Sequence, residues 1–197
     1  KYLEFYQEVV NRTLKMVIEW QRVGFVHGVM NTDNMSILGL TIDYGPYGWL
    51  EDFNPDWTPN TTDSQNRRYR FGNQPDIALW NLVQLGNALY PLIGDIPAME
   101  KILEDYNTLF DQQYHQMMKN KLGLEENYDN ILHDDLQAVL KLTETDMTIF
   151  YRNLSSVLKT DFAENALEKI TKSFYKPDEI KEKIKDNRVR TFEKRLR

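Results

Sequence analysis

The 197-residue sequence contains no cysteine. Disulfide bonds, zinc sites built from thiolates and cysteine nucleophiles are therefore excluded. A chain without disulfides fits a reducing compartment, so we expect a cytoplasmic protein.

Long apolar runs are also missing. No stretch approaches the ~18 consecutive apolar residues that a membrane-spanning helix needs, and the first residues show no signal-peptide pattern. The chain also has no excess of positive charge. It contains 24 Lys and Arg and 30 Asp and Glu, which gives a formal net charge of -6. We therefore expect neither a membrane nor a nucleic acid as a partner.

The sequence does contain enough apolar material for a sizeable core, with 41% hydrophobic and 12% aromatic residues. Its length suits one domain or one large lobe. The chain begins in helical register without an initiator Met and ends without a helix stop signal. We expect a piece of a longer protein, with residues 1–197 forming a single lobe.

Helical periodicity dominates the chain. Residues 1–23 repeat apolar side chains at helical spacing before a Gly24 stop signal, and Pro75 opens a second, heavily apolar helix. Further helices are predicted at residues 97–121, 129–142, 145–158, 161–173 and 178–195. Ser36–Leu38 and Leu40–Ile42 instead predict a small β-hairpin turning at Gly39. The expected fold is mainly α, a helical bundle with this one hairpin.

Residues 44–74 break any period with proline, glycine and small polar residues. A loop this long inside a compact domain is usually functional or disordered, and its aromatic residues indicate that it packs onto a body. Arg67, Arg68 and Arg70 form its only basic cluster. Arg67 and Arg68 could meet a phosphate or a protein substrate, although a solvated pair is the simpler interpretation.

Two polar clusters, Asn31–Asn34 and Asp43–Gly45, flank the predicted hairpin. Magnesium takes a few oxygen ligands from protein and leaves the remaining positions to water and phosphates. Asp33, Asn34 and Asp43 could supply such oxygens from two adjacent loop ends. The alternative is that an Asp-Asn pair in a loop serves only to form a turn.

The spacing of these residues can be compared with the kinase catalytic loop, His-Arg-Asp-x-x-x-x-Asn. His27 and Asn34 stand at its His and Asn positions, and Asp43 opens Asp-Tyr-Gly where Asp-Phe-Gly would follow. In kinases that Asn and that second Asp hold magnesium. Val29 occupies the position of the first Asp, and Asp33 is the only carboxylate in the loop. This pattern predicts a kinase-like site that either does not phosphorylate or performs different chemistry on the nucleotide.

The run from Gly24 to Pro46 closely resembles the selenoprotein O family, also called the YdiU family. Residues 69–75 and 78–82 continue the resemblance, whereas residues from about 95 onward resemble the family only in being helical. The resemblance implies the C-terminal lobe of a protein-kinase-like fold. Residues 1–94 would hold the catalytic loop, the metal hairpin and an activation-like loop, and residues 95–197 a helical remainder. An N-terminal lobe with a Gly-rich loop and a phosphate-binding Lys would lie upstream of this chain.

The resemblance also implies an activity. Family members transfer AMP from ATP to Ser, Thr or Tyr hydroxyls of proteins with Mg²⁺ (or Mn²⁺), and UMP transfer is attributed to bacterial members. By position, Asp33 would be the catalytic base. Asn34 and Asp43 would be the metal ligands, with Asp43 also lying against the nucleotide phosphates. We expect the isolated lobe to be inactive.

Two functions other than nucleotide transfer to proteins remain open. Because Val29 replaces the usual catalytic Asp, the chain could be an inactive pseudokinase scaffold that binds proteins, although retention of Asp33, Asn34 and Asp43 argues against it. The chain could also belong to an ordinary protein kinase that uses Asp33 as its catalytic Asp.

The three histidines have simpler explanations than catalysis. We expect His27 to brace its loop and His115 to be a surface or core filler. His133 with Asp134 and Asp135 resembles a metal cluster, but acids that open an apolar helix suit the helix dipole.

Overall fold

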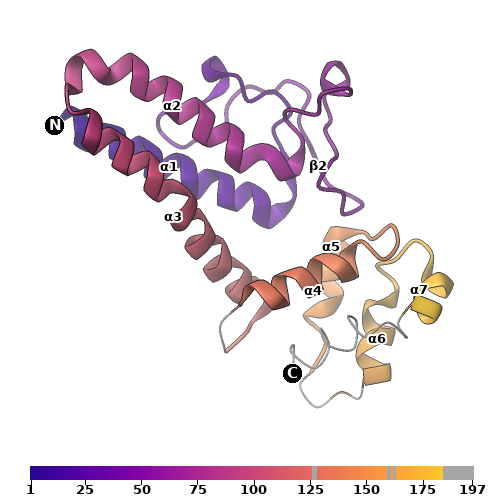
Figure 1. Cartoon of the computed structure of the whole chain (residues 1–197). Helices are drawn as coiled ribbons and strands as arrows, with labels where there is room; N and C mark the ends of the chain where they lie inside the picture. Colours follow the sequence, from indigo (N-terminus) through magenta and orange to yellow (C-terminus); the bar gives the residue numbers. More distant parts are fainter. Residues whose placement is uncertain (126–127, 159–160, 162, 184–197) are drawn as a thin grey trace. The chain divides into compact units, whose positions relative to one another are not determined.

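The computed structural model describes residues 1–125, 128–158, 161 and 163–183 (Figure 1). These residues are mainly helical and include one small antiparallel sheet. The chain divides into two compact units. The first comprises Lys1–Trp49 and Pro55–Tyr114, and the second comprises Leu50–Asn54 and His115–Arg197.

The helices follow the sequence periodicity. They are α1 (Tyr2–Val23), α2 (Gln74–Ile93), α3 (Ile96–Leu122), α4 (Asn130–Leu140), α5 (Met147–Leu154), α6 (Ala163–Thr171) and α7 (Pro177–Lys183). The predicted helix at 145–158 ends early, and the part of the predicted 178–195 helix beyond Lys183 lies outside the described residues. The short 3-10 turns are η1 (Thr32–Asn34), η2 (Thr61–Asp63) and η3 (Phe71–Asn73).

The predicted hairpin at residues 36–42 is wrong. This segment forms a turn, in which the Gly39 N–H donates to the Ser36 carbonyl at 3.1 Å, and it contains no strand. The only strands in the described part of the chain are β1 (Phe25–Val26) and β2 (Gly48–Trp49), which pair antiparallel.

The segment fails to form a hairpin because it packs against α1. A Cβ on Gly39, whose φ is +67°, would lie 2.8 Å from the Arg12 Cβ. The Trp20 Nε1 donates to the Thr41 hydroxyl at 2.9 Å. Contacts with α1 therefore set the path of this segment in place of cross-strand pairing.

In the first unit, α1 and α2 run side by side (Figure 1). The buried Tyr6 hydroxyl donates to the Leu82 carbonyl of α2 at 2.9 Å, and burial raises the pKa of Tyr6 to about 12. Gly86 lets the helices approach, because a Cβ there would lie 2.8 Å from this hydroxyl. At its other end α1 stops at Gly24, whose left-handed φ of 73° turns the chain into β1.

In the second unit, Leu50–Asn54 runs along the start of α5. The Phe53 N–H donates to the Thr145 carbonyl, and the Met147 N–H donates to the Glu51 carbonyl, each at 2.8 Å. Side chains from α4 and α5, including Leu136 and Phe150, are fully buried here. No helix among the described residues is long and apolar enough to cross a membrane.

Candidate functional site

The loop that follows β1 is fixed by buried amide side chains of α2. The Gln74 Oε1 accepts from the His27 N–H at 2.9 Å, and its Nε2 donates to the Phe25 carbonyl at 2.9 Å. About two turns further on, the Asn81 Nδ2 donates to the Met30 carbonyl at 2.9 Å. A buried backbone group without a partner is costly, so these bonds hold the loop in one path.

The segment after β2 braces the same loop from its other side. The Asn60 Nδ2 donates to the Gly28 carbonyl at 3.1 Å, and the Tyr69 hydroxyl donates to the Asn31 Oδ1 at 2.5 Å. Gly28 has a φ of +79°, and a Cβ there would lie 2.2 Å from the Pro46 carbonyl oxygen. The prediction that the long loop packs onto a body is confirmed for this part of it.

His27 joins the two polar clusters. Its buried ring accepts the Val29 N–H at Nδ1 (3.3 Å), while its Nε2 lies 2.9 Å from the Ile42 carbonyl oxygen. A carbonyl can only accept, so Nε2 carries a hydrogen and donates it to Ile42. The imidazole thus ties the start of the loop to the residue before Asp43, and the expected bracing role is confirmed.

Asp33 and Asn34 lie on η1 at the end of this loop. The Asn34 Nδ2 donates to the Val29 carbonyl at 3.0 Å, which orients its amide and leaves Oδ1 free of hydrogen-bond donors from the described residues. Asp33 is exposed, and no described side chain or backbone group bonds to its carboxylate. Both residues therefore present oxygens to an incoming ligand.

Asp43 adopts an unusual backbone conformation. Its φ is +66°, a left-handed value that costs a residue with a Cβ about 1–2 kcal/mol. The side chain is exposed, and its Oδ2 lies 3.4 Å from where a Cβ of Gly45 would stand. Such strain persists where surrounding contacts impose it, and it clusters at functional sites. Here the His27 bond to Ile42 is one of those contacts.

The donor chemistry of these residues fits a hard divalent cation. Two exposed carboxylates and one oriented amide oxygen match the preferences of Mg²⁺ or Mn²⁺, which leave further positions to water and phosphate. Among the described residues there is no group of three or more His, Cys, Asp or Glu that could hold a metal. Binding at Asp33, Asn34 and Asp43 would thus depend on the amide and on oxygens from a bound nucleotide.

The other sequence candidate, His133 with Asp134 and Asp135, lies on α4 in the second unit. The His133 Nδ1 is 2.9 Å from the Tyr128 hydroxyl. His115 places its Nε2 2.9 Å from the Asn130 Oδ1. These rings take part in a local hydrogen-bonded cluster.

The sequence did not predict the bracing role of Gln74, Asn81, Asn60 and Tyr69, although three of them lie in the stretches 69–75 and 78–82 that carry the family resemblance. One signal was available for Asn81, since it falls on the α2 face that buries Ile77 and Ala78, where the period calls for an apolar residue. A buried amide at such a position must bond to something. Its partner, 51 residues away in sequence, could not be read from the spacing.

Comparison with known proteins places the chain in a family. A family model described as protein adenylyltransferase SelO matches residues 1–197. Proteins named protein nucleotidyltransferase YdiU are similar to this chain in several bacteria. That of Flavobacterium johnsoniae is 62% identical over 188 residues, which cover 94% of this chain and 36% of the relative. That of Rhodopirellula baltica is 59% identical over 155 residues, or 77% of this chain and 29% of the relative.

A third relative, from Aromatoleum aromaticum, carries the same name and is 52% identical over 174 residues. The match covers 87% of this chain and 33% of that protein. The chain thus spans about a third of the length of the curated relatives it matches.

Proposed function

Because this chain belongs to the SelO family, we propose that it supplies the catalytic and metal-binding loops of a protein nucleotidyltransferase. The complete enzyme would transfer AMP, or UMP, from a nucleoside triphosphate to Ser, Thr or Tyr hydroxyls of proteins. The observation that carries this proposal is the His27 bridge, which ties the loop of Asp33 and Asn34 to the residue before Asp43.

In this proposal Asp33 is the general base. Its carboxylate has no partner among the described residues, so it is available to accept a proton from the attacking hydroxyl. The hydroxyl oxygen forms a bond to the α-phosphorus as the bond from that phosphorus to pyrophosphate breaks. The proton passes to Asp33, and pyrophosphate leaves.

Asn34 and Asp43 would hold Mg²⁺ or Mn²⁺ together with phosphate oxygens. When bound, the ion neutralises negative charge on the phosphates. The Val29 carbonyl orients the Asn34 amide, and the bond from His27 to Ile42 positions Asp43. Transfer of this kind depends mainly on positioning and charge stabilisation, so a few well-held side chains are sufficient.

We place these loops in the C-terminal lobe of a protein-kinase-like fold. Support comes from the chain order, in which a long helix leads to a loop ending in Asn34, followed by Asp43 and Gly45. The half-buried Val29 stands where kinases have their catalytic Asp, and this observation favours the second candidate, an inactive scaffold that binds proteins.

Labelled ATP separates these possibilities. In a complete protein carrying this chain, we expect the α-phosphate label to appear on protein, and Asp43→Ala to reduce labelling by about 100-fold or more. Asp134→Ala, which removes an exposed carboxylate of α4, is the matched control and should label normally. Transfer of the γ label alone would indicate an ordinary kinase. Absence of both labels across a proteome extract would support the scaffold.

A further inference from the structure

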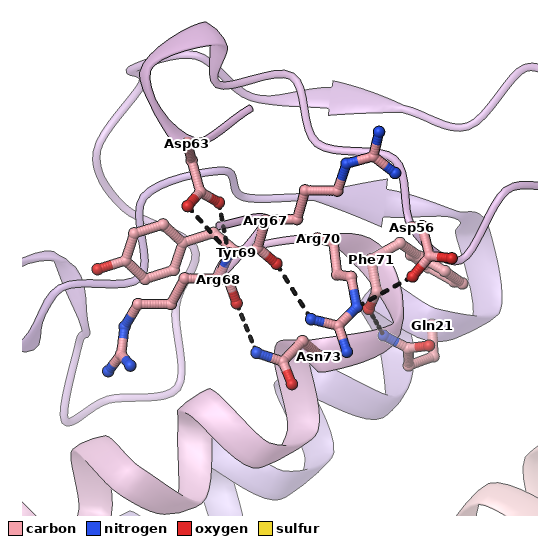
Figure 2. Close-up of polar contacts among 9 residues, drawn as sticks. All are labelled: Gln21, Asp56, Asp63, Arg67, Arg68, Tyr69, Arg70, Phe71 and Asn73. Carbon is pink, nitrogen blue, oxygen red and sulfur yellow. Dashed lines mark hydrogen bonds and ion pairs between the residues drawn. The ribbon is translucent and has the colours of Figure 1, made fainter. Parts of the chain in front are cut away.

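The turn between η2 and η3 is organised by one carboxylate (Figure 2). The Asp63 Oδ1 accepts the Arg68 N–H at 2.9 Å, and its Oδ2 accepts the Tyr69 N–H at 2.7 Å. The Asp63 carbonyl accepts the Arg67 N–H at 2.7 Å. The Asn73 Nδ2 closes the turn by donating to the Arg68 carbonyl at 2.6 Å. Both backbone polar groups of Arg68 are therefore bonded, and the residue is held in place.

The three arginines of this turn differ in their partners. Arg70 is part of the structure, because its Nε lies 3.2 Å from the Asp56 Oδ1 and its Nη1 donates to the Arg67 carbonyl. Arg67 and Arg68 are exposed, and neither guanidinium has an ion-pair or hydrogen-bond partner in the part of the chain that the structure describes. Their side chains leave the turn in opposite directions in Figure 2.

Arg68 is the arginine with a preorganised side chain. Its Cζ lies 4.8 Å from the centroid of the Trp80 ring and 5.7 Å from that of the Tyr69 ring. Contact with aromatic rings restricts the guanidinium and leaves N–H groups for a planar, bidentate partner such as a carboxylate. A group fixed in advance loses less entropy when it binds.

The turn that carries Arg68 is hydrogen-bonded to the loop of the proposed catalytic base. The Tyr69 hydroxyl bonds to the Asn31 Oδ1 at 2.5 Å, and Asn31 precedes Asp33 by two residues, which span at most about 7 Å. We therefore expect the residues that flank the acceptor hydroxyl of a protein substrate to reach this turn.

We propose that Arg68 is a specificity residue that binds an Asp or Glu side chain near the acceptor hydroxyl of the protein substrate. This inference rests on the proposed function, because it assigns a preference to the same site. An acidic segment complements a cation that has no counter-charge in the described part of the chain. It does not share the ligands of the nucleotide, whose phosphates would lie at Asn34 and Asp43.

Peptide binding without nucleotide tests this directly. Two synthetic peptides of equal length would each carry one Ser, flanked by Glu in one and by Gln in the other. Their affinities for a complete protein carrying this chain would be measured by fluorescence anisotropy. We expect the Glu peptide to bind about fivefold more tightly, as an exposed charge pair allows, and the preference to weaken with added salt.

Matched variants locate the effect. Arg68→Ala should abolish the preference for the Glu peptide, and Arg68→Lys should retain only part of it because the ammonium cannot bind bidentately. Arg67→Ala removes the same charge from the adjacent residue and should leave the preference intact. Thermal melts of each variant would establish that the fold is kept. A preference that survives Arg68→Ala, or that disappears equally in Arg67→Ala, would overturn the proposal.

A transfer assay separates this proposal from the proposed function. With α-labelled ATP, Arg68→Ala should raise KM for the Glu peptide about fivefold and leave KM for ATP unchanged. A rise in KM for ATP instead would mean that Arg68 binds the nucleotide, and the substrate role would be wrong. If the wild type transfers no label but still prefers the Glu peptide, the nucleotidyltransferase function fails while the acidic docking site stands.

Discussion

Asp43 has a strained backbone conformation, and His27 supports the residue that precedes it. Asp43 has a left-handed φ of 66°, and the His27 ring is hydrogen-bonded to the carbonyl of the preceding Ile42. A carboxylate held on a strained backbone is fixed in direction, which suits a ligand that must meet a phosphate and a cation together. At Asp43, the conformation that suits ligand binding therefore lowers the stability of the fold.

Replacing the strained residue tests that competition. Asp43→Gly should raise the free energy of unfolding by about 1 kcal/mol, because glycine adopts a positive φ without steric cost. Nucleotide transfer by a complete protein carrying this chain should be lost in the same variant. Urea unfolding would measure the change in stability, with Asp43→Ala as the control that keeps the strain. A glycine variant that is less stable than wild type would show that Asp43 is not strained.

At the scale of elements, helix α2 acts as the support for the site loop. Gln74 bonds both the His27 N–H and the Phe25 carbonyl, so one side chain satisfies backbone groups on β1 and on the loop. Because Gln74 is buried, its loss would leave both groups without water or protein partners.

Two glutamines of the same helix allow a matched comparison. Gln74→Ala should lower the free energy of unfolding by about 2–4 kcal/mol, since two buried backbone groups lose their partners. Gln84→Ala changes the same residue type at a half-buried position, where no hydrogen bond of the side chain is present among the described residues, and should cost less than about 1 kcal/mol. Urea unfolding of both variants would measure the two losses in the free energy of unfolding. Equal losses would mean that the Gln74 bonds do not stabilise the loop.

The secondary structure could be predicted from the sequence where it depends on local patterns. Long amphipathic helices such as α1 and α2 were predicted because helix formation repeats a local pattern. The pattern at residues 36–42 predicts a hairpin, but the segment forms a turn that packs on α1, with the Trp20 Nε1 donating to the Thr41 hydroxyl. Helix α5 ends early, where the Ser155 hydroxyl bonds back to the Arg152 carbonyl.

The candidate site was predictable only in part. The motif spacing predicts Asp33, Asn34 and Asp43 as the site residues, since those residues are close in sequence. The braces could not be found in this way, because the Gln74 and Asn81 bonds cross 47 and 51 residues. Contacts over such distances depend on helix packing, which local patterns do not encode.

For the whole molecule, the chain spans about a third of the length of its curated relatives. Asp33 and Asp43 are exposed, as are the nearby side chains of Leu38 and Leu40. The two carboxylates are therefore open to solvent and do not enclose a ligand. Ligand sites usually bury most of their ligand's surface.

We therefore predict that the 197-residue chain by itself binds Mg·ATP weakly or not at all. Isothermal titration calorimetry on this chain would measure the affinity, with circular dichroism as the check that its helices are formed. A dissociation constant in the micromolar range would contradict the prediction and show that this chain contains the whole nucleotide site.

The most direct measurement is a titration of Mn²⁺, followed by electron paramagnetic resonance, into a complete protein carrying this chain and bound to ATP. If Asn34 and Asp43 grip one ion, Asn34→Ala and Asp43→Ala should each weaken Mn²⁺ binding by about 10-fold or more, and the double variant should lose less than the product of the two. Unchanged affinity in either single variant would contradict a shared metal site on the two loops that His27 joins.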